Sequence, residues 1–412
     1  MKLSEELQAR GFINQISADS LFEILDGTKR VVYHGIDPTA DSAHAGNFVV
    51  WMLLRHLADN GHKVIFLVGG GTGMIGDPKP DVERSLSEPE VVAARVEKIK
   101  KQAERLLGGK EITFVNNYTW LGSQNLITFL RDIGKHFTVN ELIKKDAIAN
   151  RLQGESGISY TEFAYPLLQA FDYLTLYREH GCDVQIGGSD QWGNIISGVD
   201  LIRRVEQKKV YAVTVPLIID KASGKKFGKS EGNAVWLDSE KTSPYHFYQF
   251  WLNASDESVI DYLKLFTLLP LEKIAQIETE LQENKGARAA QHILAHEVTA
   301  FVHSEDAATS VEKVSRILFG GGDVSTLTVL EKQMLIDNAP VYEVLIESTV
   351  GDLLVSAQLA TSNREARTFI ESGAVVLGTQ KVESPLQTVA LLQGDIVPLR
   401  RGKKNFVILY RK

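Results

Sequence analysis

The chain has 412 residues, of which 44% are apolar and 24% are charged; this composition is close to that of globular proteins and excludes collagen, coiled coils and disordered chains as a description of the whole. No apolar run reaches the ~18 residues that a membrane-spanning helix needs, and the single cysteine, Cys182, excludes an internal disulfide and a cage of thiolate metal ligands. Because Lys2, Glu5 and Glu6 open the chain without an apolar stretch, we expect no signal peptide, no membrane attachment and a reducing, cytoplasmic location.

The net charge of −7 is unevenly distributed along the chain. Residues 351–412 contain nine Lys or Arg against five Asp or Glu, so this part carries +4 and the rest of the chain −11. A basic C-terminal module on an acidic body favours a polyanionic partner. A soluble tail with ordinary surface lysines is the alternative that charge alone leaves open.

Two strand–helix–strand units are predicted in the first half of the chain. In the first unit, the apolar run 30–36 is followed by a helical pattern over about 43–60 and by a second apolar run over 63–68. The corresponding segments of the second unit are 184–188, 190–206 and 210–218. Two such units predict an α/β fold with a doubly wound, parallel, Rossmann-like sheet, whose ligands lie beyond the carboxyl ends of the strands.

The remainder of the chain is predicted to be mainly helical up to a small C-terminal module. Helical pattern fills about 87–177, which includes an insertion, and 239–319. The last module begins near Gly351, where the capping-box sequence 362–365 opens a helix that Gly373 ends. We therefore expect four parts: residues 1–238, the sheet domain with its helical insertion; 239–320, an α-helical domain; 321–350, a linker; and 351–412, a small α+β domain.

The sequence Gly71-Thr-Gly-Met-Ile-Gly76 matches the glycine pattern of dinucleotide-binding folds. That pattern needs a helix that continues past the third glycine, and Asp77, Pro78 and Pro80 interrupt one here. We favour a tight turn that lets a substrate approach the backbone. Dinucleotide binding is the less favoured alternative.

Two segments have the chemistry of phosphate binding. One carries Thr39 and then His44 in the first turn of a helix, where free N–H groups attract phosphate and Gly46 leaves room for a flat base. The other is Lys225-Lys-Phe-Gly-Lys-Ser230, a mobile loop by composition, whose ammonium groups can close onto a polyphosphate. The structural alternatives are a helix capped by Ser42 with His44 on the surface, and a solvated run of charge.

A polar stripe is predicted on one later helix. Tyr165, Gln169 and Asp172 are spaced i, i+4, i+7, so they share one helix face and can line one wall of a pocket. Apolar neighbours, Phe163 and Phe171 among them, favour a half-buried wall over a stripe that faces water.

The helix start at His44 and the lysine loop together resemble the two signatures of class I aminoacyl-tRNA synthetases, usually written His-Ile-Gly-His and Lys-Met-Ser-Lys-Ser. Around them the chain resembles bacterial tyrosyl-tRNA synthetases over nearly its whole length, most specifically in Gln185-Ile-Gly-Gly-Ser-Asp-Gln-Trp-Gly-Asn194. Other matching segments are 37–42, 67–78, 129–137, 226–230 and 242–251. In two departures, Asn47 replaces the second His of the first signature, which implies altered ATP contacts, and the segment after Pro78 lacks the usual Gly/Lys-rich run.

This resemblance implies a two-step reaction. The carboxylate of L-tyrosine attacks the α-phosphorus of ATP to give tyrosyl-adenylate and pyrophosphate, and the 3′ end of tRNA-Tyr then accepts the tyrosyl group. ATP is expected to bring Mg²⁺, without a tightly bound cofactor or a metal site in the protein. The resemblance also implies a homodimer with its interface near 129–137, an anticodon-region contact by 239–320 and an RNA-binding role for 351–412.

Matching positions assign residues to four roles under this resemblance. The catalytic residues are Thr39, His44, Asn47, Arg84, Lys226, Lys229 and Ser230. The tyrosine-binding residues are Tyr33, Asp77, Tyr165, Gln169 and Asp172, and the ATP-binding residues are Asp37, Gly46, Gly188, Asp190, Gln191 and Lys229. The candidates for tRNA contact are Lys144, Lys145, Arg151, Arg203, Arg204, Lys208, Lys209, Arg364, Arg367, Lys403 and Lys404, and for each lysine an ordinary solvated role stays open.

Three other identities are compatible with parts of the pattern. A tryptophanyl-tRNA synthetase shares the fold and both signatures, but the pair Tyr33 and Asp172 and the basic tail argue against it. A nucleotidyltransferase of the same superfamily carries a similar helix start without a C-terminal RNA-binding module. A non-catalytic RNA-binding paralogue, inactivated through Asn47, is disfavoured by the intact loop 226–230.

Overall fold

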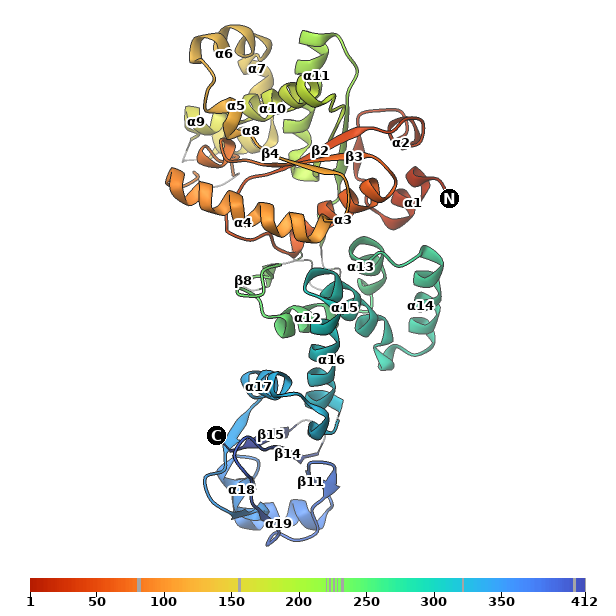
Figure 1. Cartoon of the computed structure of the whole chain (residues 1–412), viewed down its shortest axis with the longest axis vertical. Helices are drawn as coiled ribbons and strands as arrows, with labels where there is room; N and C mark the ends of the chain where they lie inside the picture. The colour runs from red at the N-terminus through yellow and green to blue at the C-terminus, as the bar shows by residue number, and fades with distance from the viewer. Residues whose placement is uncertain are drawn as a thin grey trace. The chain divides into compact units, whose positions relative to one another are not determined.

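The computed structural model describes residues 1–79, 83–154, 157–219, 221, 224, 227, 229–230, 233–320, 322–402 and 405–411, with the backbone alone at 146, 229, 230, 233 and 320. The chain divides into two compact units (Figure 1). Unit 1 comprises residues 1–243 and 250–294, and unit 2 comprises residues 244–249 and 295–412. This division is coarser than the four parts expected from the sequence, whose boundaries stay predictions.

Unit 1 is built on a six-stranded sheet with the order β1-β6-β5-β2-β3-β4. The strands are β1 (Gln15–Ile16), β2 (Val31–Ile36), β3 (Lys63–Val68), β4 (Ile112–Asn116), β5 (Val184–Gly188) and β6 (Tyr211–Val215). All neighbouring pairs are parallel except β1 with β6. The side chains of β3 are buried along nearly its whole length, which explains why it appears in the sequence as an unbroken apolar run.

Helices cover both faces of this sheet. Figure 1 shows α3 (Ala45–Asp59) and α4 (Pro89–Leu107) on one face and α10 (Tyr165–His180) and α11 (Trp192–Glu206) on the other. Since the strands proceed outward from β2 in one direction and from β5 in the other, the connections reverse between these two strands. The predicted doubly wound sheet is therefore confirmed, and its switch point marks the expected place for a ligand.

The helical pattern predicted over 87–177 misses strand β4, which forms one edge of the sheet. No residue of β4 is fully buried, so the strand lacks the strong apolar signal of its neighbours. The short helices that follow it are α5 (Tyr118–Leu121), α6 (Leu126–Asp132), α7 (Val139–Leu142), α8 (Asp146–Gln153) and α9 (Tyr160–Phe163).

Two further helices lie near the start of the chain, α1 (Leu3–Arg10) and α2 (Leu21–Leu25). The helical pattern predicted over 239–319 agrees with α12 (Pro244–Leu252), α13 (Val259–Phe266), α14 (Leu271–Glu283), α15 (Ala289–Val302) and α16 (Glu305–Gly320). Within the described part of the chain, no helix has both the length and the apolar character that crossing a bilayer requires.

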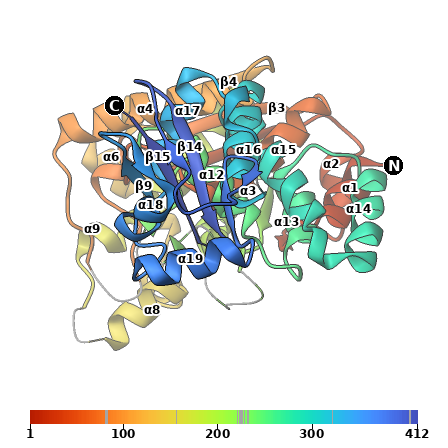
Figure 2. The same cartoon turned by 90° about the horizontal axis from the view of Figure 1, so that it is seen from below.

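Unit 2 contains a five-stranded sheet with the order β12-β11-β14-β15-β9. Its elements are α17 (Val329–Asn338), β9 (Val341–Glu343), β10 (Ser348–Thr349), α18 (Val350–Ser356), α19 (Asn363–Glu371), β11 (Val375–Leu377), β12 (Gln380–Lys381), β13 (Thr388–Val389), β14 (Ile396–Arg401) and β15 (Asn405–Tyr410). Helices α18 and α19 pack against this sheet (Figure 2). Strand β9 lies inside the expected linker and pairs in parallel with β15, so this stretch is not merely a connection.

The start of α19 follows the predicted pattern in part. The hydroxyl of Ser362 accepts a hydrogen bond from the N–H of Glu365, as an N-cap should, and Gly373 has a φ of +69° beyond the end of the helix. The carboxylate of Glu365 accepts from the N–H of Thr361 instead of closing the reciprocal bond to Ser362.

Candidate active site

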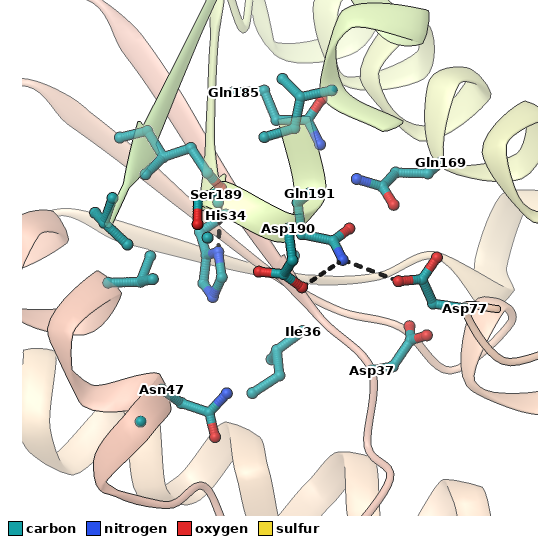
Figure 3. Close-up of a pocket in the computed structure, with 18 of the residues that line it drawn as sticks. His34, Ile36, Asp37, Asn47, Asp77, Gln169, Gln185, Ser189, Asp190 and Gln191 are labelled. Carbon is teal, nitrogen blue, oxygen red and sulfur yellow. Dashed lines mark hydrogen bonds between the residues drawn. The ribbon is translucent and has the colours of Figure 1, made fainter. Parts of the chain in front are cut away.

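A cavity of about 310 Å³ opens at the carboxyl ends of β2, β5 and β6, beside the switch point of the sheet (Figure 3). Its size and position are those of a small-molecule site. Most of the substrate-site residues predicted from the sequence line it: Tyr33, Asp37, Thr39, Gly46, Asn47, Asp77, Arg84, Tyr165, Gln169, Asp172, Gly188, Asp190 and Gln191. His44 is not among the lining residues.

The buried carboxyl group of Asp172 and the partly buried one of Asp37 lie in one hydrogen-bond network along the wall of the cavity. Asp37 accepts bonds from the hydroxyls of Tyr165, at 2.8 Å, and Thr72, at 2.7 Å. Nδ2 of Asn117 donates to the hydroxyl of Thr72 and to Oδ2 of Asp172, both at 2.9 Å. The network therefore connects Asp37 to Asp172 through two side chains that the sequence pattern did not single out.

Asp172 lies 3% exposed at the deep end of the cavity. Its second oxygen accepts from Nε1 of Trp120 at 2.7 Å. Burial raises the pKa of Asp172 to about 7, and burial likewise raises the pKa of Asp37 to about 6. Among the described residues, no group makes a hydrogen bond with the buried hydroxyl of Tyr33, which also lines this end.

A second polar cluster lies where Asp77, which follows the Gly71–Gly76 turn, approaches the segment after β5 (Figure 3). The carboxylate of Asp77 accepts from Nε2 of Gln191 at 2.9 Å and from Nδ2 of Asn194 at 3.0 Å. Gln191 also donates to Asp190 at 3.1 Å. Burial raises the pKa of Asp77. A Cβ at Gly188 would come within 2.5 Å of Oδ1 of Asp190, so a side chain there would displace that carboxylate.

His44 forms the N-cap of α3. Its Nδ1 accepts from the N–H of Gly46 at 3.0 Å, and Oδ1 of Asn47 accepts from the N–H of His44 at 3.2 Å. A Cβ at position 46 would lie 2.9 Å from the imidazole, so glycine is required for this cap. The sequence pattern placed His44 in the first turn of the helix, whereas the structure has it one position earlier, as the N-cap. Ser42 is not the cap, because its hydroxyl donates to the carbonyl of Ala43.

Within the lysine loop, residues 225–230, Phe227 is the residue whose side chain the structure describes. Its ring is 9% exposed and packs against Tyr262 and Phe266, with centroids 4.7 and 5.2 Å apart. Phe227 lines the cavity, and its carbonyl oxygen would be 3.6 Å from a Cβ at Gly46. The lysine loop and the start of α3 therefore border the same cavity.

The cationic residues of that loop are described only in part. Strand β7 (Lys229–Ser230) pairs antiparallel with β8 (Asn233–Ala234). Lys226 lies outside the described residues, and so do the side chains of Lys229 and Ser230.

Sequence reasoning missed several residues of the cavity wall. His34 lines it, and its Nδ1–H donates to the carbonyl of Ile186 at 3.2 Å, which leaves the other ring nitrogen facing the cavity (Figure 3). Burial lowers the pKa of His34 to about 4, so the ring is neutral at pH 7. Gln185 also lines the cavity. Both residues belong to strands whose carboxyl ends were expected to border the site. Their position in these strands was the sequence feature that could have identified them as lining residues.

One of the predicted tRNA-binding residues is corrected by its burial. Arg151 is 1% exposed and its Nη1 lies 2.9 Å from Oε2 of Glu162, so its guanidinium is not available to RNA. Lys145 is partly buried and its ammonium group donates to the carbonyl of Gly193 and the hydroxyl of Ser197. Burial lowers the pKa of Lys145. Its contact with RNA stays a prediction.

The other described candidates for RNA contact are exposed. Ion pairs engage three of them, since Arg203 pairs with Asp200, Arg204 with Glu141 and Lys209 with Glu23. Lys144, Lys208, Arg364 and Arg367 are also exposed, the last two on one face of α19. Lys403 and Lys404 lie outside the described residues.

An apolar surface lies on the short helices after β4. Tyr118, Leu126, Ile127, Leu130 and Val139 are between 42% and 70% exposed. A hollow of about 280 Å³ beside them is lined mainly by apolar residues, including several of the Gly71–Gly76 turn. Phe129 itself is 9% exposed and belongs to the core.

Comparisons with known proteins agree with this geometry. The family model described as "tRNA synthetases class I (W and Y)" matches residues 26–320, and the "Tyrosine--tRNA ligase SYY-like C-terminal domain" matches residues 331–409. Tyrosine--tRNA ligase 2 of Enterococcus faecalis is 47% identical over 98% of both chains, and the tyrosine--tRNA ligase of Leuconostoc mesenteroides is 44% identical over 99% of both.

Solved structures give the same result. A C-terminally truncated mitochondrial tyrosyl-tRNA synthetase of Aspergillus nidulans is similar with a TM-score of 0.70 and 32% identity, over 77% of this chain and 94% of that one. The tryptophanyl-tRNA synthetase of Plasmodium falciparum, at 14% identity and a TM-score of 0.55 over 74% of this chain and 84% of that one, shares the fold. The chain therefore belongs to the class I tRNA synthetases and, within them, to the tyrosine–tRNA ligases.

Proposed function

We propose that this chain activates L-tyrosine with ATP to tyrosyl-adenylate and then transfers the tyrosyl group to the 3′ end of tRNA-Tyr. The observation that carries the proposal is that Tyr33, whose buried hydroxyl makes no hydrogen bond among the described residues, and the buried Asp172 line the same cavity. A phenol can accept a hydrogen bond from Tyr33 and donate one to Asp172.

This pair accounts for amino-acid selection. A phenylalanine ring in the same place would leave a buried hydroxyl and a buried carboxyl without their partner, which costs about 1–3 kcal/mol per group. The indole of tryptophan is larger than the space that a phenol needs. Tyr165, Gln169 and Asp77 border the middle of the cavity and are assigned to the ammonium group of the substrate.

ATP is assigned to the side of the cavity that opens toward α3. Gly188, Asp190 and Gln191 are placed at the ribose, with Asp37 near, and the backbone at Gly46 lies against the base. Thr39, Asn47 and Arg84 also line the cavity. His44 at the helix start is assigned to the leaving pyrophosphate together with Lys226, Lys229 and Ser230. Asn47 supports the proposal because its amide can donate a hydrogen bond as a histidine does.

The chemistry needs positioning and charge stabilisation, since the substrate carboxylate is itself the nucleophile. The carboxylate oxygen forms a bond to the α-phosphorus in line with the departing pyrophosphate. The start of α3 and the cations of the loop stabilise the charge that grows on that leaving group. We assign Mg²⁺ to ATP, where it would help to neutralise the charge of the phosphate groups.

The partners follow from the two exposed surfaces. We propose that Arg364 and Arg367 on α19 contact RNA phosphates and that residues 239–320 reach the anticodon region. The apolar surface with Leu126, Ile127 and Leu130 is proposed as the homodimer interface, because so large an exposed apolar patch is typical of protein contacts. The expected cytoplasmic location stays a prediction.

ATP–pyrophosphate exchange, measured with each amino acid in turn, tests the proposal. Exchange is expected with tyrosine alone. Exchange driven by tryptophan would identify a tryptophanyl enzyme, and the absence of exchange with any amino acid would identify a non-catalytic paralogue; either result overturns the proposal.

A further inference from the structure

We infer that the buried pair of Arg151 and Glu162 positions Arg84 for the activation step, so that Glu162 is a positioning residue of the adenylation site. The inference rests on the proposed function and adds two residues to it. Neither Arg151 nor Glu162 lines the cavity.

The pair is deeply buried, with side chains 1% and 2% exposed and a distance of 2.9 Å between Nη1 of Arg151 and Oε2 of Glu162. Removing two charges from water carries a large desolvation cost, so such a pair is weak support for stability by itself. A structural or positional role is the better explanation for charges in this place.

The same pair contacts the backbone at Arg84 and at Lys79. Oε1 of Glu162 accepts a hydrogen bond from the backbone N–H of Arg84 at 2.9 Å, and Nη1 of Arg151 donates to the carbonyl of Lys79 at 3.3 Å. Nε of Arg151 donates to the carbonyl of Gly157 at 2.8 Å, which fixes the guanidinium between α8 and α9.

The side chain of Arg84 then crosses the glycine turn into the cavity. Its Nε donates to the carbonyl of Asp77 at 2.8 Å. Gly76 has a φ of +85°, and a Cβ there would lie 2.9 Å from Cγ of Arg84, so both the backbone and the space require glycine. Burial raises the pKa of Asp37 and of Asp77, and the positive charge of Arg84 offsets part of this rise at both lining residues.

Helix capping does not explain Glu162. Ser159-Tyr-Thr-Glu162 has the sequence of a capping box, and the hydroxyl of Ser159 does accept from the N–H of Glu162 at 3.3 Å. The carboxylate of Glu162, however, contacts Arg84 and Arg151 instead of returning to the N-cap. Its contacts therefore point to the segment over the active site.

The test compares Glu162→Gln, Arg84→Ala and the double variant in the full chain, with Glu179→Gln on the exposed end of α10 as the matched control. Tyrosine-dependent exchange by the unmodified chain is measured first, because its absence would defeat the proposed function and not this inference. We then expect Glu162→Gln to lower kcat/KM for ATP by about 10- to 100-fold, the scale of a 1 Å misplacement. The dissociation constant of tyrosine should stay within about twofold of its original value, since Arg84 contacts Asp77 through the backbone carbonyl while Gln191 and Asn194 hold the Asp77 carboxylate.

The double variant carries the decisive comparison. If Glu162 acts through Arg84, Glu162→Gln has no further effect on ATP use once Arg84→Ala is present. Independent, multiplying effects of the two substitutions would overturn the inference. The inference would also be overturned if Glu162→Gln lowered only the fraction of active sites, which the burst of tyrosyl-adenylate counts. A loss of tyrosine affinity as large as the loss in kcat/KM for ATP would overturn it as well. Should Glu162→Gln not fold, Arg151→Lys, which keeps the charge but lacks the forked contacts, is measured in the same way with the same criteria.

Discussion

The hydroxyl of Tyr165 donates a 2.8 Å hydrogen bond to Oδ2 of Asp37, which ties helix α10 to the loop after β2. Through Thr72 and Asn117 the same network reaches Asp172, so the groups assigned to the two ends of the tyrosine substrate are coupled. Substitutions within it should therefore show effects that do not add.

Asp172→Ala is expected to lower kcat/KM for tyrosine by about 10- to 100-fold, because this is the effect of losing a hydrogen bond to a charged group. ATP–pyrophosphate exchange at varied tyrosine concentration measures the effect. The matched control is Asp183→Ala, on the opposite end of β5 from the cavity. Unchanged kinetics in Asp172→Ala would remove this residue from phenol recognition.

The use of tyrosine should decrease as the pH falls below about 7. Burial raises the pKa of Asp172 to about 7 and that of Asp37 to about 6, so acid protonates both groups and weakens them as acceptors. A profile of kcat/KM for tyrosine against pH should show this decrease. In Asp172→Asn the step near pH 7 should vanish; its persistence would assign the step to another group.

Gly46→Ala should impair activation of tyrosine while the fold is kept. The added Cβ would lie 2.9 Å from the imidazole of His44 and would displace it from the helix start. Gly27→Ala, where a Cβ meets nothing within 4 Å, is the control. Exchange kinetics and the midpoint of thermal unfolding are compared. Equal activity of the two variants would contradict the steric requirement at position 46.

Unit 1 should lose stability as the pH falls from about 6.5 toward 4. Burial lowers the pKa of His56 and of His62 to about 4 in the native state. The unfolded chain then binds more protons than the native chain in this interval. The free energy of unfolding therefore decreases by up to about 3 kcal/mol per histidine. His62→Asn keeps an acceptor for the N–H of Arg30 and should reduce the slope of the urea midpoint against pH. The same substitution at the exposed His180 should leave the slope as it was.

Replacing Arg364 and Arg367 by alanine should weaken tRNA charging and spare exchange. Both side chains are exposed on one face of α19, and each lost phosphate contact should also reduce the salt dependence of tRNA binding. Arg178→Ala, an exposed arginine of α10 that pairs with Glu206, is the control. If charging by the double variant equals that of the control, α19 does not bind RNA.

The sequence predicts the strand–helix–strand units well because apolar runs and glycine ends are local signals. The stripe of Tyr165, Gln169 and Asp172 is predicted for the same reason, and all three residues line the cavity. Side-chain spacing along one helix depends on nothing outside it.

Features that depend on distant partners are not predictable in this way. Arg151 looks like a surface cation until folding brings Glu162 beside it, and Asn117 has no local mark of its bond to Asp172. Strand β4 is missed because its burial is incomplete. The cap by His44 is missed because serine, threonine, aspartate and asparagine are the usual residues there.

Strand β15 has a consequence for chains that are cut short. It lies in the interior of its sheet, between β14 and β9, although β9 precedes it by most of unit 2. A frameshift or proteolytic cut ahead of Asn405 would leave two bare strand edges that face each other across a gap. Such edges recruit strands from other molecules, so these fragments should aggregate and be degraded instead of accumulating as enzymes that make adenylate but charge no tRNA.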